Sequence, residues 1–343
     1  MTKLNTLSLS LILALGLVAC GGGGGGGDTT IVVSNPGATY VPGAAELGAW
    51  NVLQGARTLC GFGALTRNTK LDAAALNHAK YLVDLSVTTG VSELSHLETL
   101  GVPGFTGVYP WDRTDFTPLG TDYGTQVAEI LEATVWDYVN PPIFPTMEER
   151  GAGSMRSLLN TVYHLAGAMY YGADVGLGAY MKTTMINATT WREEYRFGSL
   201  NGYQTSHITL GAGKVVTYPC QDSSSVPTKF VPALESPNPF PEMTSTSQTV
   251  GPPIYLKADA GQLLMVTSAN VSQNGVNVPI TVLTNANDPN FVPDRVGEKY
   301  IGKNEAFVVP TVALIPNTTY TVNLTGTINS LPFSRSFTMS TGQ

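Results

Sequence analysis

Three stretches of the chain place apolar residues at the spacing of an amphipathic α-helix. They run from Leu71 to Ser86, from Gly124 to Val135 and through the segment around Leu158–Tyr171. Apolar positions that recur at i, i+3, i+4 and i+7 predict a helix in each stretch. In the third helix, the predicted buried stripe consists of Met155, Leu158, Leu159, Val162, Ala166 and Met169.

Shorter segments rich in β-branched residues predict strands. The segments ADVGLGAYMK and SHITLGAGKVVTYP follow the third helix, so helices and strands together predict a mixed α/β domain over residues 41–225. Residues 226–249 are rich in Pro, Ser and Thr, which is typical of a linker. Residues 250–343 contain short alternating segments and no helical pattern, which predicts a β-sandwich. The fold class predicted for the whole chain is therefore α+β.

The first 19 residues have the pattern of an export signal. Lys3 is followed by the apolar run LSLSLILALGLV, which is too short to span a bilayer, and by small residues before Cys20. The segment LVAC resembles a bacterial lipobox, in which the cysteine is acylated and becomes the N-terminus. The run Gly21–Gly27 predicts a flexible tether within residues 20–40, as a lipid-anchored domain requires. The other interpretation is an ordinary cleaved signal with a chance cysteine.

The charge balance excludes some classes of partner. Removal of residues 1–19 takes one of the 18 basic residues and none of the 25 acidic ones, so the exported chain has 17 against 25, or a net charge of −8. Nucleic acids and anionic membrane surfaces attract surfaces rich in Lys and Arg, so neither is an expected partner. The membrane contact that we expect is the N-terminal lipid.

Two cysteines remain once Cys20 is acylated. Cys60 and Cys220 lie far apart in the sequence, and two cysteines in an oxidising compartment usually pair with each other. We therefore predict a disulfide between them. A catalytic thiol is the alternative, although neither cysteine has an activating base close to it in the sequence.

The histidines divide by their position on the predicted helices. His78 lies on the apolar stripe of the first helix, which favours a buried histidine beside the core. His164 lies on the polar side of its helix, and His96 follows the first helix, next to Glu98. If His96, His164 and the carboxylate of Glu129 converge in one cleft, they could bind a divalent metal or act as an acid–base pair.

The order of these motifs resembles the CAP superfamily, which includes cysteine-rich secretory proteins, insect antigen 5 and plant pathogenesis-related proteins. The resemblance runs through ARTLCGFGALTRNTKLDAAALNHAKYL, SHLETLGVPGFTG, DR (Asp112-Arg113), YGTQVAEIL, LLNTVYHLAG and GADVGLG, over about 170 residues. It implies a three-layer α-β-α sandwich whose cleft is built around two histidines and two acids. His96 resembles the first histidine, Glu129 the first acid and His164 the second histidine. The resemblance therefore implies that His164 points into the cleft.

The chain departs from the family pattern at several positions. Ala128 and Ile130 flank Glu129 in place of the usual GEN context, and Leu165 replaces the arginine that commonly follows the second histidine. A second acid is not identified, because Glu148 and Glu149 stand in a different context. Residues 250–343 resemble the bacterial Ig-like modules that often end exported proteins, which implies a spacer or binding module.

Three functions follow from these observations. The favoured one is a lipoprotein whose cleft binds a small-molecule, lipid or protein ligand, with a divalent metal such as zinc on the two histidines and Glu129. The second is a metal-dependent hydrolase of peptide or glycan bonds, with Glu129 as base, although no G-x-S-x-G or H-E-x-x-H motif is present. The third is a structural or adhesive lipoprotein with a degenerate cleft. Gly21 follows the anchor cysteine, and the sorting rule for Gram-negative lipoproteins then implies the outer membrane, on its periplasmic side or at the cell surface.

Overall fold

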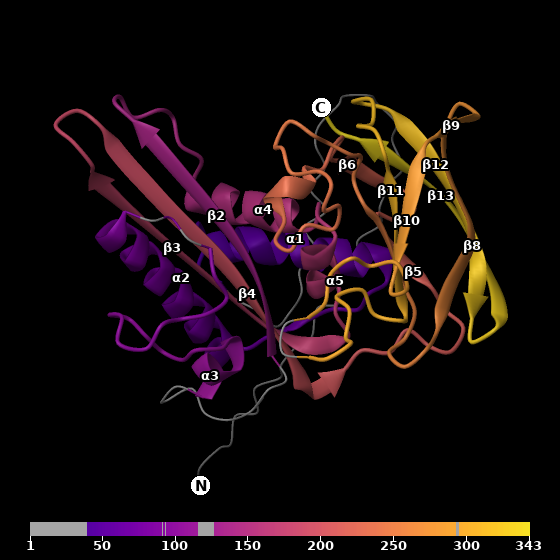
Figure 1. The fold of residues 1–343 in the computed structure, drawn as a ribbon, viewed down its shortest axis with the longest axis horizontal. Coiled ribbons are helices and arrows are strands. Elements are labelled where there is room, and N and C mark those ends of the chain that lie inside the picture. The colour runs from indigo at the N-terminus through magenta and orange to yellow at the C-terminus, as the bar shows by residue number, and fades with distance from the viewer. Residues whose placement is uncertain (1–39, 91, 93, 116–126, 293–294) are drawn as a thin grey trace, which may run out of the picture. The chain divides into compact units, whose positions relative to one another are not determined.

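The computed structural model describes residues 40–90, 92, 94–115, 127–292 and 295–343 (Figure 1). The predicted signal, Cys20 and the glycine tether lie outside these residues. Helices and several β-sheets are both present, which confirms the α+β fold class. The helices are α1 (Ala45–Cys60), α2 (Thr69–Thr89), α3 (Pro110–Asp115), α4 (Met147–Leu158), α5 (Tyr163–Ala168) and the 3₁₀-helix η1 (Pro232–Leu234).

The strands of the N-terminal half are β1 (Thr66–Arg67), β2 (Val127–Tyr138), β3 (Gly172–Met185) and β4 (Trp191–His207). The remaining strands are β5 (Val216–Tyr218), β6 (Ser223–Val226), β7 (Ile254–Lys257), β8 (Leu264–Gln273), β9 (Val276–Val278), β10 (Ile280–Thr284), β11 (Glu305–Pro310), β12 (Thr319–Ile328) and β13 (Leu331–Thr341). They form three sheets, in the orders β1-β3-β4-β2, β10-β11-β7-β5 and β6-β13-β12-β8-β9.

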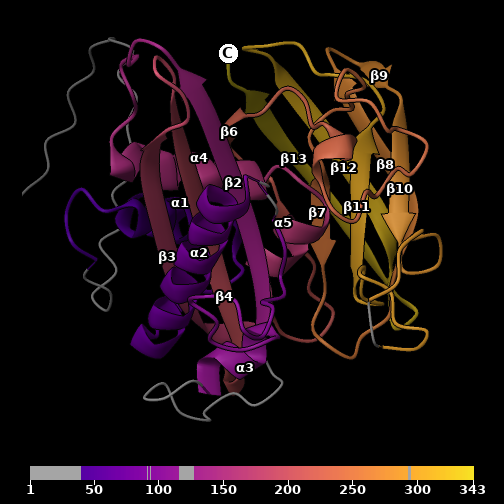
Figure 2. The ribbon, with the colours of Figure 1, turned by 60° about the vertical axis from the view of Figure 1, so that its left-hand side comes forward.

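The first sheet carries helices on both faces. Helix α2 packs along β3 and β4 on one face, and helices α1, α4 and α5 cover the other, as Figures 1 and 2 show. Strand β4 lies in the centre, antiparallel to β3 and to β2. Asn68 caps α2 by accepting the backbone N–H groups of Lys70 and Leu71. Because α2 packs on β4 and β2 pairs with it, β4 fixes the side chains of α2 and β2 relative to each other.

The prediction of a helix from Gly124 to Val135 is wrong, because Val127–Tyr138 is strand β2. The apolar residues Val127, Ile130 and Leu131 have helical spacing, but the strand pairs residue by residue with β4 from Val127 to Tyr138. The segment also ends in Val135, Trp136, Asp137 and Tyr138, of which all but Asp137 are good strand formers. Sheet pairing therefore overrides a weak local helical pattern.

The predicted third helix is divided into α4 and α5. Helix α4 ends at Leu158, and a turn over residues 159–162 precedes α5. Thr161 Oγ1 donates to the Leu158 carbonyl, and Asn160 N–H donates to the Ser157 carbonyl. Such local bonds from Asn and Thr compete with a continuing helix. The predicted apolar stripe is nevertheless buried, apart from the half-buried Ala166.

The C-terminal half contains two sheets that pack face to face. Apolar side chains of β7 and β11 meet those of β8 and β12 in one core. The opposite face of the β7 sheet is also covered, because Tyr255 stacks on Phe62 of the N-terminal half at 5.9 Å between ring centroids. All four residues of β7 are buried for this reason. Strands β5 and β6 belong to these two sheets, although both begin before the predicted domain boundary at residue 225.

The segment over residues 226–249, which we predicted to be a linker, packs against the rest of the fold. Phe230 and Phe240 are buried in the core that the two halves share. Glu235, at the end of η1, is buried and accepts backbone hydrogen bonds from the start of α5. Two apolar anchors and one buried carboxylate therefore hold a segment whose composition is typical of a spacer.

The disulfide between Cys60 and Cys220 is present and closes a loop of 160 residues. It joins the end of α1 to the segment between β5 and β6, so it links the two halves. A loop of this length stabilises the fold by about 5 kcal/mol in the chain-entropy model. None of the helices in the described ranges has the length and apolar character needed to cross a membrane.

Gly151 allows helices α1 and α4 to cross closely, and it provides a test of this fold. A Cβ at Gly151 would overlap the backbone of Ala45, whereas a Cβ at Gly153 on the same helix would meet no atom within 4 Å. We expect Gly151→Ala to lower the free energy of unfolding by about 3 kcal/mol, because the helices must separate. Gly153→Ala should raise it by about 0.5–1 kcal/mol through helix propensity. Urea unfolding measures both, and equal effects would contradict the close crossing.

Candidate functional site

Glu129 lies at the centre of a cluster of charged and polar side chains at the start of β2. Its side chain is fully buried. One carboxylate oxygen accepts a hydrogen bond from Arg113 Nη2 at 2.7 Å, and the other lies 3.0 Å from His96 Nδ1. The second oxygen is also 3.7 Å from His78 Nε2. The structure therefore brings together His96 and Glu129, as expected, and adds two residues that we had not assigned to the site.

His78 connects the cluster to the segment after α2. The ring is completely buried, and its Nδ1 lies 2.9 Å from Glu98 Oε1. Its Nε2 lies 2.9 Å from the carbonyl oxygen of Ser95, the residue before His96. Glu98 in turn accepts the N–H of Thr106 at 2.6 Å. A buried imidazole thus fixes the chain on both sides of His96.

Arg113 fixes the same chain from α3. Its Nη1 donates to the carbonyl oxygen of His96 at 3.0 Å, while its Nη2 binds Glu129. The guanidinium is fully buried, and its Nε has no hydrogen-bond partner among the described residues. Arg113 therefore positions both members of the His96–Glu129 pair.

The electrostatics keep Glu129 ionised. Burial alone would raise the pKa of its carboxyl group, but the positive charges of Arg113 and His78 and the hydrogen bond from His96 outweigh burial and lower the pKa to about 2. An anionic Glu129 favours a proton on Nδ1 of His96. In the neutral ring Nε2 then has a free lone pair, and in the charged ring it has an N–H to donate.

The His96 side chain is the half-exposed member of this cluster. It is 45% exposed, and Nε2 has no hydrogen-bond partner among the described residues. Four exposed apolar side chains lie in the same segment of the chain. We call them the apolar rim: Leu94, Leu97, Leu100 and Val108.

His164 is not part of this cluster. Its Nδ1 lies 3.2 Å from Glu235 Oε1 and 3.2 Å from Thr161 Oγ1, and these are its side-chain partners in the described part of the chain. Glu235 also accepts the backbone N–H groups of Val162, Tyr163 and His164 at the start of α5. His164 therefore lies on the polar face of its helix and contacts Glu235, in the segment that we predicted to be a linker.

The described residues do not fit the expected metal centre. Among them, no three or more His, Cys, Asp or Glu side chains are grouped to hold a metal ion. The set of His96, Glu129 and His164 is not formed, and Arg113 lies 2.7 Å from Glu129, where its charge would repel a cation. The site chemistry that remains is that of an oriented imidazole.

Sequence reasoning missed His78, Glu98 and Arg113 as parts of the site. The position of His78 on a buried stripe correctly predicts burial, and His78 is fully buried. A buried imidazole requires hydrogen-bond partners, and this requirement could have indicated a nearby acid such as Glu98. Arg113 belongs to the dipeptide DR in the series of motifs that resembles the CAP superfamily, but that resemblance gave it no role, and the segment around it has no periodic pattern.

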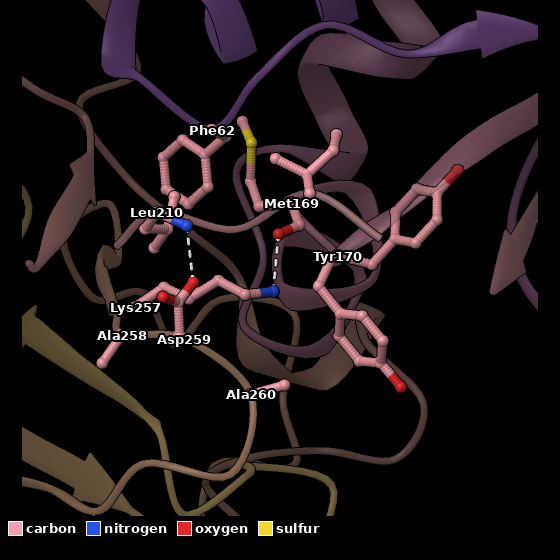
Figure 3. A pocket seen from close by; sticks show the side chains of 10 residues that line it. Phe62, Met169, Tyr170, Leu210, Lys257, Ala258, Asp259 and Ala260 are labelled. Carbon is pink, nitrogen blue, oxygen red and sulfur yellow. Dashed lines mark hydrogen bonds between the residues drawn. The ribbon is translucent and has the colours of Figure 1, made fainter. Parts of the chain in front are cut away.

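A second polar location lies between α5 and β7 (Figure 3). Lys257 is only 4% exposed, and its Nζ donates to the Met169 carbonyl oxygen at 2.7 Å. Burial lowers the pKa of the Lys257 ammonium to about 8, although Glu305 opposes this shift. The adjoining cavity has a volume of about 10 Å³, which is room for about one water molecule. Lys257 therefore acts as a structural contact at the end of α5.

Comparison with known proteins does not assign the chain. No protein-family model matches the sequence, and no curated protein matches it.

The charge of Glu129 predicts a specific dependence of stability on pH. Because its pKa is lowered from 4.5 to about 2, its contribution is complete above pH 4.5 and is lost as the pH falls toward 2. The difference in unfolding free energy between wild type and Glu129→Gln should therefore shrink by on the order of 3 kcal/mol over this range. Urea unfolding at several pH values measures it. Asp137→Asn is the control, because it removes an exposed partner of Arg192. The loss of stability that it causes should disappear in high salt. A constant difference for Glu129→Gln would contradict the ionised state.

Variants at α5 test the position of His164. Glu235→Ala should lower the free energy of unfolding by about 3 kcal/mol, because three backbone N–H groups lose their acceptor. His164→Ala should have a smaller effect and should leave zinc binding, measured by calorimetry, the same as in wild type. Loss of zinc binding in His164→Ala with unchanged stability would instead place His164 in a metal site.

Proposed function

We propose that the chain is an exported, membrane-anchored protein of the CAP superfamily that binds a ligand at His96. One observation carries the binding site: a half-exposed imidazole whose Nδ1 is held at 3.0 Å by the buried, ionised Glu129. Buried Arg113 and His78 fix this geometry from two other elements. Such a supporting network is typical of a site that must keep one side chain in a defined orientation.

Sequence and fold support the family and the location. The ordered motifs around His96 and Glu129 resemble the superfamily, and helices on both faces of one sheet agree with the α-β-α sandwich that the resemblance implies. The two packed sheets of the C-terminal half support an Ig-like module. The signal pattern and the LVAC segment support export and a lipid on Cys20.

The ligand that fits combines an acceptor group with an apolar part. Protonated His96 donates from Nε2 to an anionic group. The apolar rim offers exposed aliphatic surface in the same segment. A carboxylate with an aliphatic chain meets both requirements.

Octanoate is a suitable probe for this site. We expect it to shift the imidazole NMR signals of His96, and His96→Gln should weaken its binding by roughly tenfold or more, since a hydrogen bond to a charged group is lost. Acetate lacks the chain and octanol lacks the charge, so each should bind more weakly than octanoate. Leu100→Asn should weaken octanoate but leave acetate unchanged.

His164→Gln is the matched control, because it changes a histidine outside the cluster. Equal octanoate affinity in wild type and His96→Gln would refute a binding site at His96. Absence of any response to the three probes would favour a structural role for the cluster.

A hydrolase is the second candidate, and the orientation of His96 favours it specifically. A neutral imidazole held at Nδ1 by a carboxylate is arranged to take a proton at Nε2 from water or from a substrate hydroxyl. Among the described residues, no Ser, Thr or Cys side chain is bonded to His96, so the nucleophile would be water. Hydrolysis of peptide or glycan substrates that disappears in His96→Gln would establish this activity.

A further inference from the structure

A second group of exposed apolar side chains lies at the opposite end of β2 from Glu129. We call it the sheet tip, and its members belong to the end of β2, the following loop and the β3–β4 turn. The residues are Trp136, Val139, Ile143, Met185, Ile186 and Trp191. Figures 1 and 2 show these strand ends projecting beyond α1 and α4.

The strand register places three of the six residues of the sheet tip, Trp136, Met185 and Trp191, on one face of the sheet. Trp191 of β4 lies directly between Tyr138 of β2 and Met185 of β3, and directly paired residues share a face of the sheet. Trp136 pairs with Glu193, two residues from Trp191, and therefore shares that face.

The loop after β2 continues the same surface. Phe144 stacks on Trp136 at 5.3 Å between ring centroids and meets Tyr138 edge-on at 5.2 Å. Ile143, next to Phe144, is fully exposed. The three strand ends and this loop thus present aromatic and aliphatic groups together on a projecting part of the fold.

The composition of the sheet tip matches a lipid–water interface. Trp and Tyr favour the headgroup level of a bilayer, and aliphatic side chains favour the region just below it. Two ion pairs lie beside the tip, Arg192 with Asp137 at 2.7 Å and Arg150 with Glu193 at 2.7 Å. Glu148 and Glu149 at the start of α4 have no cationic partner among the described residues and accept from the Gly43 N–H and from Thr146. Paired charges reduce both the attraction to anionic lipids and the penalty of approaching a neutral bilayer.

The described chain starts away from the tip and passes α4 on its way into α1. Tyr40 Oη donates to Asp72 at 2.7 Å, and Asp72 accepts from the N–H of Leu177, eight residues before Met185 on β3. The N–H of Gly43 donates to Glu148 Oε2 at 3.0 Å. Glu148 is in the first turn of α4, five residues after Ile143. A tether of 20 residues from Cys20 to residue 40 spans up to roughly 65 Å when extended, so the anchor can lie in a bilayer that the sheet tip contacts; this step rests on the lipid anchor of the proposed function.

We infer that the sheet tip rests in the interface of the membrane to which the chain is anchored. The two Trp rings lie among the headgroups, and Ile143 and Val139 enter the outer acyl region. From Glu129 to Tyr138, β2 spans roughly 30 Å. His96 is therefore held away from the bilayer, where it can meet a ligand.

Fluorescence quenching in vesicles tests the inference. The lipidated protein is reconstituted in phosphatidylcholine vesicles with or without bromine on the acyl chains. The chain has four Trp residues and two lie at the tip, so brominated lipid should remove up to about half of the Trp emission if both reach the interface. Trp136→Phe with Trp191→Phe should abolish most of this loss, and Ile143→Asn should reduce it roughly twofold.

Leu97→Asn with Leu100→Asn is the matched control at the other end of β2, and it should leave quenching unchanged. No quenching in wild type, or equal quenching in the tip and control variants, would overturn the inference. A dimer in sedimentation that Ile143→Asn converts to a monomer, without quenching, would also overturn it and assign the tip to a second copy.

Flotation of the vesicles separates this inference from the proposed anchor. Wild type that does not float, and a Cys20→Ser variant that behaves identically, would refute the lipid anchor. Quenching measured at high vesicle concentration would then still decide the inference: its presence supports contact of the tip with the bilayer, and its absence overturns it.

Discussion

The packing of the two halves depends on α5, a helix of six residues. Two side chains of opposite charge, both from other parts of the chain, bind its two ends. The carboxylate of Glu235 accepts three backbone N–H groups at the start of α5, and the ammonium of Lys257 binds the Met169 carbonyl at its end. Both charges complement the helix dipole. A helix this short is not stable by itself, so α5 exists because the C-terminal half holds it. In return, α5 fixes β7 and the segment after β6 against the first sheet.

The site at His96 follows the same physical rule, in which a buried charge is kept by several partners. Glu129 is anionic at ordinary pH because Arg113 and His78 compensate for its burial. Removal of Arg113 would take away the largest of the interactions that compensate for the burial of the Glu129 charge, which is unfavourable. The cluster therefore behaves as one unit, and His96 is its single member with substantial exposure. Rigid support for one exposed imidazole is more than a purely structural cluster requires.

The sequence predicted features that follow from local periodicity, from the number of cysteines or from the family resemblance. It predicted α2, the buried stripe of α4 and α5, the disulfide and the contact of His96 with Glu129. It did not predict β2, because pairing with β4 lies outside any local window, nor the role of His164, because its partner Glu235 is 71 residues away. Burial of Glu235 in a Pro- and Ser-rich segment has no compositional signal. The errors therefore fall where long-range contacts override local preference.

Strand β2 runs from the Glu129 site at one end of the first sheet to the sheet tip at the other end. At one end it carries the buried Glu129, and at the other it carries exposed Trp136 and its neighbours. A strand in the register of a long central partner is stiff, so the distance between a polar site and an apolar tip is constant. The ligand site that we propose at His96 and the bilayer contact that we infer for the tip both depend on such a fixed spacing. The sequence of β2 changes from buried charge to exposed aromatic residues along its length because its two ends face different surroundings.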